Sequence, residues 1–300
     1  MRTTRSHPLR PLVALSGCLF AAGLAVIAVQ AQPFAVTLTP AMVEAGSPEL
    51  FRVVTGEAKS VEGEWLGRKF QFFRGRDRRA WFALAGVDVE TPVGPSTLRI
   101  HVELAQSRAR DLSRAVQIRP AHYRTRSLTV APEFVEPGPE ALKRIEAEDQ
   151  LKKNVFGEST AEPLWTGSFR APVTAPPTDS FGTRRILNGK LASIHKGMDF
   201  RAREGTPVRA GNGGVVVLAR PLYYEGNCVI IDHGLGLFTL YLHLSRIDVR
   251  EGQRVALGER LGLSGATGRV TGPHLHWAVR WQGAYLDPAK LLRLNLSAVR

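Results

Sequence analysis

The chain has 300 residues, 44% of them hydrophobic, and a formal net charge of +13. This length is enough for two modest domains, each with its own core. The 29 glycines and 19 prolines favour many turns and a β-rich architecture over long helices. No internal repeat of about 20–50 residues is present, which argues against a solenoid.

The first 31 residues are typical of a targeting segment. Three arginines precede an uncharged, mostly apolar run from Leu12 to Val29, and Ala31 ends a stretch of small residues suited to cleavage. Two alternatives stay open: an uncleaved membrane anchor, since the run is near the lower length limit for a span, and a lipoprotein box at Leu15–Cys18. All three predict an exported protein in the periplasm or at the cell envelope.

Charge and cysteine content fit that location. A basic exported protein is attracted to anionic wall polymers and phospholipids. The basic residues are dispersed, without the basic helix or aromatic signature of a nucleic-acid module, so we expect no nucleic-acid partner. Cleavage after Ala31 would leave Cys228 as the sole thiol, without a disulfide partner, and its apolar neighbours predict a buried strand residue.

Residues 32–120 are predicted to form an all-β module, with an immunoglobulin-like sandwich as its architecture. Turn signals at short spacing separate short apolar runs, which is the pattern of a sandwich. The expected strands are Phe34–Leu38, Leu50–Val54, Lys69–Phe72, Ala80–Leu84 and Ser96–Val102. His101 alternates with apolar residues there, and we interpret it as exposed or structurally satisfied.

Residues 121–160 are predicted to be a connector with a short helix. Pro139 suits the first turn of a helix over Glu140–Lys153, with Glu140 early and two lysines late, as the helix dipole favours. We expect this helix to lie across a domain junction. The proline-rich segment Ala171–Thr178 is predicted to be a loop.

Residues 161–300 are predicted to form a second β domain. Its expected strands are Gly213–Ala219, Cys228–Asp232, Leu237–His243 and His274–Val279, separated by glycines. No helix of convincing length is expected there before Pro288–Leu292.

Five of the eight histidines lie between His195 and His276. A catalytic zinc takes three protein ligands and keeps one position for water. We interpret four of these histidines, with Asp199, as one open zinc site. The alternative is a set of unrelated surface or core histidines.

The spacing of these residues constrains their roles. On a strand, His274 and His276 would face the same way but about 6.6–6.8 Å apart along the chain, which favours one ligand and one neighbour acting on water or substrate. His195 and Asp199 are four apart and share a face of a strand, a turn or a helix. Two imidazoles and one carboxylate would leave the metal a net charge of about +1, which retains Lewis acidity. The remaining histidines could move protons or stabilise an oxyanion.

Three stretches resemble the lysostaphin/LytM-type zinc peptidases. They are, in order, Phe181–Phe200 with its His-Lys-Gly-Met-Asp motif, Tyr241–Ser245, and Gly262–Trp277 with its His-Leu-His motif. The resemblance covers about residues 162–290. No position that the family's motifs require is substituted in this sequence.

This resemblance implies the site. The metal ligands would be His195, Asp199 and His276, holding one zinc per chain, and the catalytic histidines would be His243 and His274. It also implies a curved antiparallel sheet with the site in a groove, and peptidoglycan stems or cross-links as the substrate.

Competing motifs are weaker. His233 resembles a family position outside the metal set, so we interpret it as structural. Ser264 lacks the second glycine of a nucleophile elbow because Ala266 occupies it. No phosphate-loop lysine follows Gly262–Gly272, no His-Glu-x-x-His helix is present, and Trp277 is expected to be a packing residue.

The sequence therefore predicts a mainly β chain with an exported zinc metalloendopeptidase domain at residues 161–300. The alternative is a non-hydrolytic regulator that uses the same fold to bind the wall and activate an amidase. The sequence does not define the oligomeric state, the peptide bond cut or the role of the first module.

Overall fold

The computed structural model describes Met1 and residues 34–300, apart from positions 56–57, 106–107, 190, 298 and 300 and the side chains of 191 and 192. The predicted targeting segment, with its anchor and lipoprotein alternatives, thus lies outside the described residues except for Met1. Residues 34–300 form one compact unit. None of the described helices combines the length and the apolar character that a membrane crossing needs.

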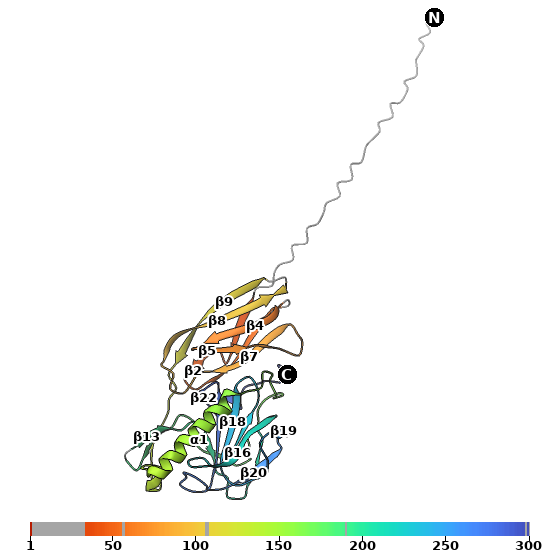
Figure 1. The fold of residues 1–300 in the computed structure, drawn as a ribbon. Helices are drawn as coiled ribbons and strands as arrows, with labels where there is room; N and C mark the ends of the chain where they lie inside the picture. The colour runs from red at the N-terminus through yellow and green to blue at the C-terminus, as the bar shows by residue number, and fades with distance from the viewer. Residues whose placement is uncertain (2–33, 56–57, 106–107, 190, 298, 300) are drawn as a thin grey trace. The chain divides into compact units, whose positions relative to one another are not determined.

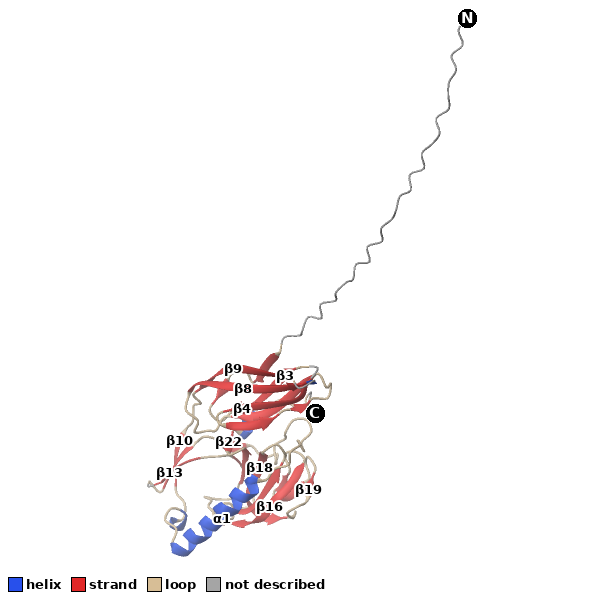
Figure 2. Cartoon of the chain, turned by 45° about the horizontal axis from the view of Figure 1, so that its top comes forward, coloured by secondary structure: helices blue, strands red, loops and turns tan. Residues whose placement is uncertain are grey.

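Strands dominate the regular structure of this unit, as predicted (Figure 2). The first module contains two sheets. In spatial order the first comprises β1 (Ala35–Thr39), β3 (Pro48–Val54), β7 (Ala80–Gly86) and β6 (Phe73–Arg74). The second comprises β2 (Val43–Glu44), β9 (Ala109–Arg119), β8 (Gly94–Leu104), β4 (Ala58–Trp65) and β5 (Arg68–Gln71).

The two sheets share one core. Phe51 on β3 meets Trp65 on β4 edge to face, with ring centroids 5.3 Å apart, and both side chains are fully buried. Each predicted run overlaps an observed strand, but β2, β4, β6 and β9 were not predicted. Most side chains of β9 are exposed, with only Val116 and Ile118 buried, so it carries too little apolar pattern to be recognised.

The second module is built on a ten-stranded sheet whose described pairings are all antiparallel, as predicted. Its main path runs β11 (Pro177–Asp179), β14 (Met198–Phe200), β21 (Leu275–Trp281), β18 (Leu237–Ile247), β17 (Gly226–Asp232), β16 (Gly214–Leu222) and β19 (Arg254–Val255). The strands off this path are β15 (Pro207–Arg209), β20 (Arg260–Ser264) and β22 (Ala284–Leu286).

Two predictions about connecting segments need correction. The segment Ala171–Thr178 is not loop throughout, because β11 begins at Pro177 and pairs with β14. A proline is tolerated there because β11 is the edge strand of the sheet. The predicted connector also contains a strand, β10 (Thr125–Leu128), which joins β12 (Arg184–Leu187) and β13 (Leu191–Ile194) in a separate three-stranded sheet.

The predicted helix is present as α1 (Pro139–Gly157), with proline at its first turn as expected. It extends four residues beyond Lys153, so the two lysines are not in its last turn. Instead of lying only across a junction, α1 packs along the β16–β18 face of the sheet (Figure 1). Other helices of the described residues include a 3-10 turn (Pro132–Phe134) and α2 (Pro288–Leu291). Within the described part of the second module no long helix precedes α2, as predicted.

One side of the sheet is sealed by the C-terminal half of α1. Phe156 meets Phe238 of β18 edge to face at 5.2 Å, and the guanidinium of Arg280 on β21 lies 3.9 Å from the Phe156 ring. Side chains two apart on a strand share a face, so His276, Ala278 and Arg280 project to this same side. The helix therefore covers the face that carries the predicted site further along β21.

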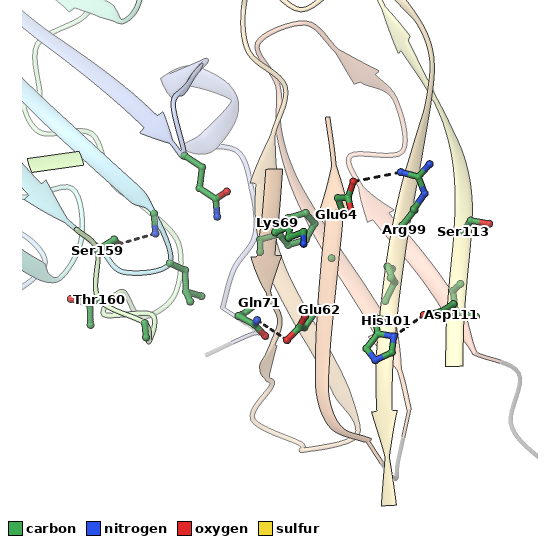
Figure 3. Close-up of a pocket in the computed structure, with 18 of the residues that line it drawn as sticks. Glu62, Glu64, Lys69, Gln71, Arg99, His101, Asp111, Ser113, Ser159 and Thr160 are labelled. Atoms are coloured by element: carbon green, nitrogen blue, oxygen red, sulfur yellow. Dashed lines mark hydrogen bonds and ion pairs between the residues drawn. The ribbon is translucent and has the colours of Figure 1, made fainter. Parts of the chain in front are cut away.

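A hollow of about 840 Å³ lies where the first module faces the end of α1 (Figure 3). Several of its charged side chains have polar partners in the wall: the Gln71 amide donates to Glu62, Arg99 pairs with Glu64, and His101 with Asp111. None of the five predicted site residues lines it. The chemistry lies elsewhere.

We predict that Phe156→Ala lowers the free energy of unfolding by about 1–3 kcal/mol, because it removes the ring that packs between Phe238 and Arg280. Leu142→Ala on the same helix is the matched control, since Leu142 is 53% exposed, and should change stability by less than about 0.5 kcal/mol. Denaturant unfolding of both variants provides the comparison. Equal effects would show that α1 is not anchored through Phe156.

Candidate metal centre and groove

The sheet register brings the predicted ligands together. Asp199 on β14 lies directly opposite His276 on β21, and His276 lies opposite Leu242 on β18 on its other side. Directly opposed residues of an antiparallel pair have Cβ atoms about 4.5–5.5 Å apart, close enough for a carboxylate and an imidazole to meet. His195 precedes β14 and supplies a third side chain at the same point.

Three potential ligand atoms converge there. His195 Nε2 lies 3.1 Å from Asp199 Oδ1 and 2.9 Å from His276 Nδ1, and His276 Nδ1 lies 2.9 Å from Asp199 Oδ1. Tetrahedral ligands at about 2.1 Å from a zinc ion are roughly 3.4 Å apart. The observed spacing is therefore only a few tenths of an ångström tighter than a metal site requires.

The donor chemistry of this cluster fits a cation. The Nδ1–H of His195 donates to the carbonyl of Ser180 at 3.0 Å, so its Nε2 presents a lone pair to the cluster. Three lone-pair atoms this close repel one another unless a proton or a cation lies among them. Burial lowers the pKa of His276 to about 4, which favours the neutral imidazole that binds metals. The three residues thus suit a divalent metal.

Asp199 is held from its other side by Arg185. The Arg185 Nη2 donates to Asp199 Oδ2 at 2.7 Å and to Asp179 Oδ2 at 2.6 Å, which leaves Asp199 Oδ1 free for the metal. Burial alone would raise the pKa of Asp199, but the side chains of His195 and His276 beside its Oδ1 hold that pKa far below its ordinary range. The carboxylate is therefore ionised.

The sequence reasoning missed Asp179 and the role of Arg185. Thr183 Oγ1 also donates to Asp179, at 3.0 Å, and Asp179 Oδ2 lies 3.5 Å from His195 Nδ1. The available signal was the alternation of Thr183 and Arg185, which puts both side chains on one side of an extended segment. Asp179 lies in β11, which the sequence did not predict.

Gly197 is required by the close approach of His276. A Cβ on Gly197 would lie 2.5 Å from His276 Nε2 and 2.6 Å from the carbonyl oxygen of Trp277. Any side chain here would displace the imidazole. This explains the glycine between the two ligands of the His-Lys-Gly-Met-Asp motif.

His243 lies beside this cluster with a defined orientation. Its Nδ1–H donates to the carbonyl of Thr267 at 2.8 Å, which leaves Nε2 as an acceptor. Burial, reinforced by the nearby His274 and His276, lowers the pKa of His243 well below its usual value. The backbone of His243 has φ +65°, an uncommon conformation for a non-glycine residue that is often found at functional sites.

His274 is next to His243 but not in the strand that was predicted to contain it. The strand β21 begins at Leu275, and His274 forms an isolated bridge with Gly265. Its ring lies 4.9 Å from that of His243, and its Nε2 is 3.7 Å from Asp199 Oδ1. The cluster of potential metal ligands among the described residues contains His276 but not His274. The two neighbours therefore occupy different positions, as the strand spacing suggested.

A groove of about 310 Å³ opens over these groups. Asp199, His243 and His274 line it directly, whereas His195 and His276 lie beneath them. The wall also contains Arg126 of β10, Arg185 of β12, and the segment 269–273 that precedes His274. The groove is therefore walled by the small sheet on one side and by this loop on the other.

The remaining candidates behave as predicted. His233 is buried, with Nδ1 donating to the carbonyl of Gly213 and Nε2 against the hydroxyl of Thr239, each at 2.7 Å. Trp277 and Cys228 are fully buried, and Ser264 is buried with its hydroxyl on the carbonyl of Arg203. None of them faces the groove.

Comparison with known proteins follows the same stretch of chain. A family profile described as peptidase family M23 matches residues 193–288. The peptidoglycan DD-endopeptidase ShyA of Vibrio cholerae is 48% identical over 120 residues, which are 40% of this chain and 27% of that protein. The DD-carboxypeptidase/endopeptidase Mpg of Neisseria meningitidis is 44% identical over 98 residues, 33% of this chain and 23% of that protein. The chain thus spans only about a quarter of the length of these relatives.

A solved structure matches far more of the chain. The crystal structure of an M23 protein from Pseudomonas aeruginosa aligns with a TM-score of 0.63 and 30% identity, covering 81% of this chain and 92% of that one. The likeness therefore extends over the first module as well as the groove.

We predict that Arg185→Gln weakens the binding of added zinc by about 10- to 100-fold, because it removes the partner that orients Asp199. Its exposed neighbour Arg184 is the matched control, and Arg184→Gln should leave the affinity unchanged. Competition titration against a chromogenic chelator measures both. An Arg185→Gln protein that binds zinc as tightly as wild type would contradict the positioning role.

Proposed function

Because the chain belongs to peptidase family M23, we propose that it is a zinc-dependent endopeptidase that hydrolyses peptide bonds in the stems or cross-links of peptidoglycan. The observation that carries this proposal is the convergence of His195 Nε2, Asp199 Oδ1 and His276 Nδ1 beside two further histidines in a groove. Relatives named as peptidoglycan DD-endopeptidases support the substrate class.

One zinc per chain would be held by His195, Asp199 and His276. A set of two neutral imidazoles and one carboxylate leaves the ion a net charge of about +1, so it would supply a Lewis acid that polarises the scissile carbonyl and eases deprotonation of water. Arg185 orients Asp199 through a hydrogen bond to its Oδ2, and the Ser180 carbonyl fixes the tautomer of His195.

His243 and His274 then act on the reacting groups. Each donates its Nδ1–H to a backbone carbonyl, of Thr267 and Gly272 respectively, so each has an Nε2 that can accept a proton. One ring takes a proton from the attacking water while the other stabilises the developing oxyanion or protonates the leaving amine.

The proposal extends to the rest of the chain. The first module, at residues 32–120, is proposed to be an immunoglobulin-like sandwich, which its two sheets with a shared core support. Residues 121–160 connect it to the peptidase domain at 161–300. Residues 1–31 are proposed to act as a signal peptide or anchor, placing the enzyme in the periplasm or at the envelope surface. The basic charge supports contact with anionic envelope polymers and gives no reason to expect nucleic acid.

The regulator alternative gains no support from the site. A non-hydrolytic wall-binding protein needs neither a converged ligand set nor histidines poised beside it. All five groups are present here and face one point or line one groove. The enzyme is the better explanation.

We predict that the purified protein releases new amino and carboxyl ends from intact cell-wall sacculi. Activity should disappear with a chelator and return with zinc, because the metal supplies the Lewis acid. His195→Ala should lose about 10³-fold or more, and His243→Ala about 10²- to 10⁴-fold. End-group analysis of the digest provides the measurement.

The matched control is His101→Ala, which removes an exposed histidine of the first module and should leave the rate unchanged. Zinc-loaded protein that binds sacculi of several chemotypes without cutting any would contradict the enzyme and favour the regulator. Cleavage that persists in His195→Ala would contradict the metal assignment.

A further inference from the structure

Arg269 is a cation of the groove wall whose charge is not neutralised. It lines the groove that Asp199, His243 and His274 share. No ion pair or side-chain hydrogen bond of its guanidinium is formed within the described part of the chain. Its described partner is a ring, since the guanidinium carbon lies 4.4 Å from the centroid of Tyr224.

Arg185 and Glu225, two charged residues near Arg269, form ion pairs with other residues. Arg185 is ion-paired with both Asp179 and Asp199. Glu225, the residue after Tyr224, accepts from Lys152 through Oε1 at 2.7 Å, whereas its Oε2 is buried without a hydrogen-bond partner and forms no ion pair with Arg269. Arg269 therefore makes a cation–π contact with Tyr224 but binds no carboxylate among the described residues.

Backbone contacts fix the position of Arg269 relative to His243. The Arg269 amide donates to the carbonyl of Tyr224 at 2.9 Å, and Gly268, at φ +77°, packs so closely that a Cβ there would lie 2.3 Å from the amide nitrogen of Gly226. Two residues before Arg269, the carbonyl of Thr267 accepts from His243. The same short loop thus fixes both the catalytic histidine and the cation.

Arg269 is also partly withdrawn from water. Burial lowers its pKa below the ordinary arginine value, an effect that Tyr224 and Glu225 partly oppose and the Arg185 charge slightly reinforces. A half-buried guanidinium without a counter-ion loses hydration that a bound anion in the groove would replace. A ligand carboxylate would do so, because the planar fork of an arginine binds carboxylates through two parallel hydrogen bonds.

The net charge of the groove lining also favours an anionic ligand. Its ionisable lining, apart from the histidines, consists of two carboxylates, Asp179 and Asp199, and three guanidiniums, Arg126, Arg185 and Arg269. A metal in the ligand cluster would add further positive charge. Arg269 also borders a second hollow that contains the cations Arg184 and Lys196 and a single acid, Glu90. An anionic peptide is favoured in this groove over a neutral or basic one.

We propose that Arg269 is a specificity-determining residue that binds a free carboxylate of the substrate peptide beside the scissile bond. This inference rests on the proposed peptidase function and narrows its substrate to peptides that carry an ionised carboxyl group near the cut. The Tyr224 ring supports the guanidinium, which lines the groove.

The test compares two forms of one substrate. Sacculi are used either untreated or with their carboxyl groups converted to primary amides by carbodiimide and ammonia, and initial rates of end-group release are measured below saturation. Wild type should cut untreated sacculi about 10- to 100-fold faster than amidated ones. Arg269→Gln should lose that factor on untreated sacculi and stay within about two-fold of wild type on amidated ones.

Two further variants separate this role from a structural one. Arg269→Lys keeps the charge without the fork and should recover part of the preference. Arg254→Gln, which changes an exposed arginine on β19 away from the groove, should retain it in full. Zinc affinity of each variant reports whether the site itself is intact.

The outcomes are distinct. If wild type cuts both forms equally, the carboxylate preference is wrong while the peptidase function stands. If Arg269→Gln, with normal zinc affinity, loses the same factor on both forms, Arg269 stabilises the oxyanion instead and the proposal is overturned. If wild type cuts neither form, the peptidase function itself has failed.

Discussion

The arrangement of this protein depends on one cross-strand pair, Asp199 opposite His276. The pair exists because β14 and β21 are antiparallel neighbours in a register that leaves no choice about which residues meet. His195 then closes the triangle, and Gly197 allows the imidazole of His276 to come close to the chain between the two other ligands. A one-residue slip of either strand would turn one side chain to the opposite face and abolish the site.

Hydrogen bonds from neighbouring residues orient the side chains around that pair. Arg185 donates to Asp199 Oδ2, and backbone carbonyl groups hold His195 and His243 in single tautomers. The rings of His195 and His243 are therefore each directed by a donated Nδ1–H. Helix α1 covers the sheet face beyond them. Arg269 is a half-buried cation of the groove wall that forms no ion pair within the described residues, so its charge is available to a ligand.

The sequence was most informative where chemistry and spacing coincide. His195, Asp199, His243, His274 and His276 could be named from motifs that resemble those of a known family, and β18 and β21 from apolar runs, whereas β14, which carries Asp199, was not predicted. Arg185 and Asp179 could not be named, because their role arises from β11, a three-residue edge strand that starts with proline and shows no periodic pattern. Likewise β9 and β10 are mostly exposed, so their pairing is set by neighbouring strands rather than by their own residues.

The central claim is that His195, Asp199 and His276 hold a metal while His243 and His274 do not. Anomalous diffraction at the zinc edge from crystals of the zinc-loaded protein tests it directly. One peak per chain should lie within about 2.0–2.2 Å of His195 Nε2, Asp199 Oδ1 and His276 Nδ1. A peak bound by His243 or His274, or one outside this cluster, would contradict the assignment.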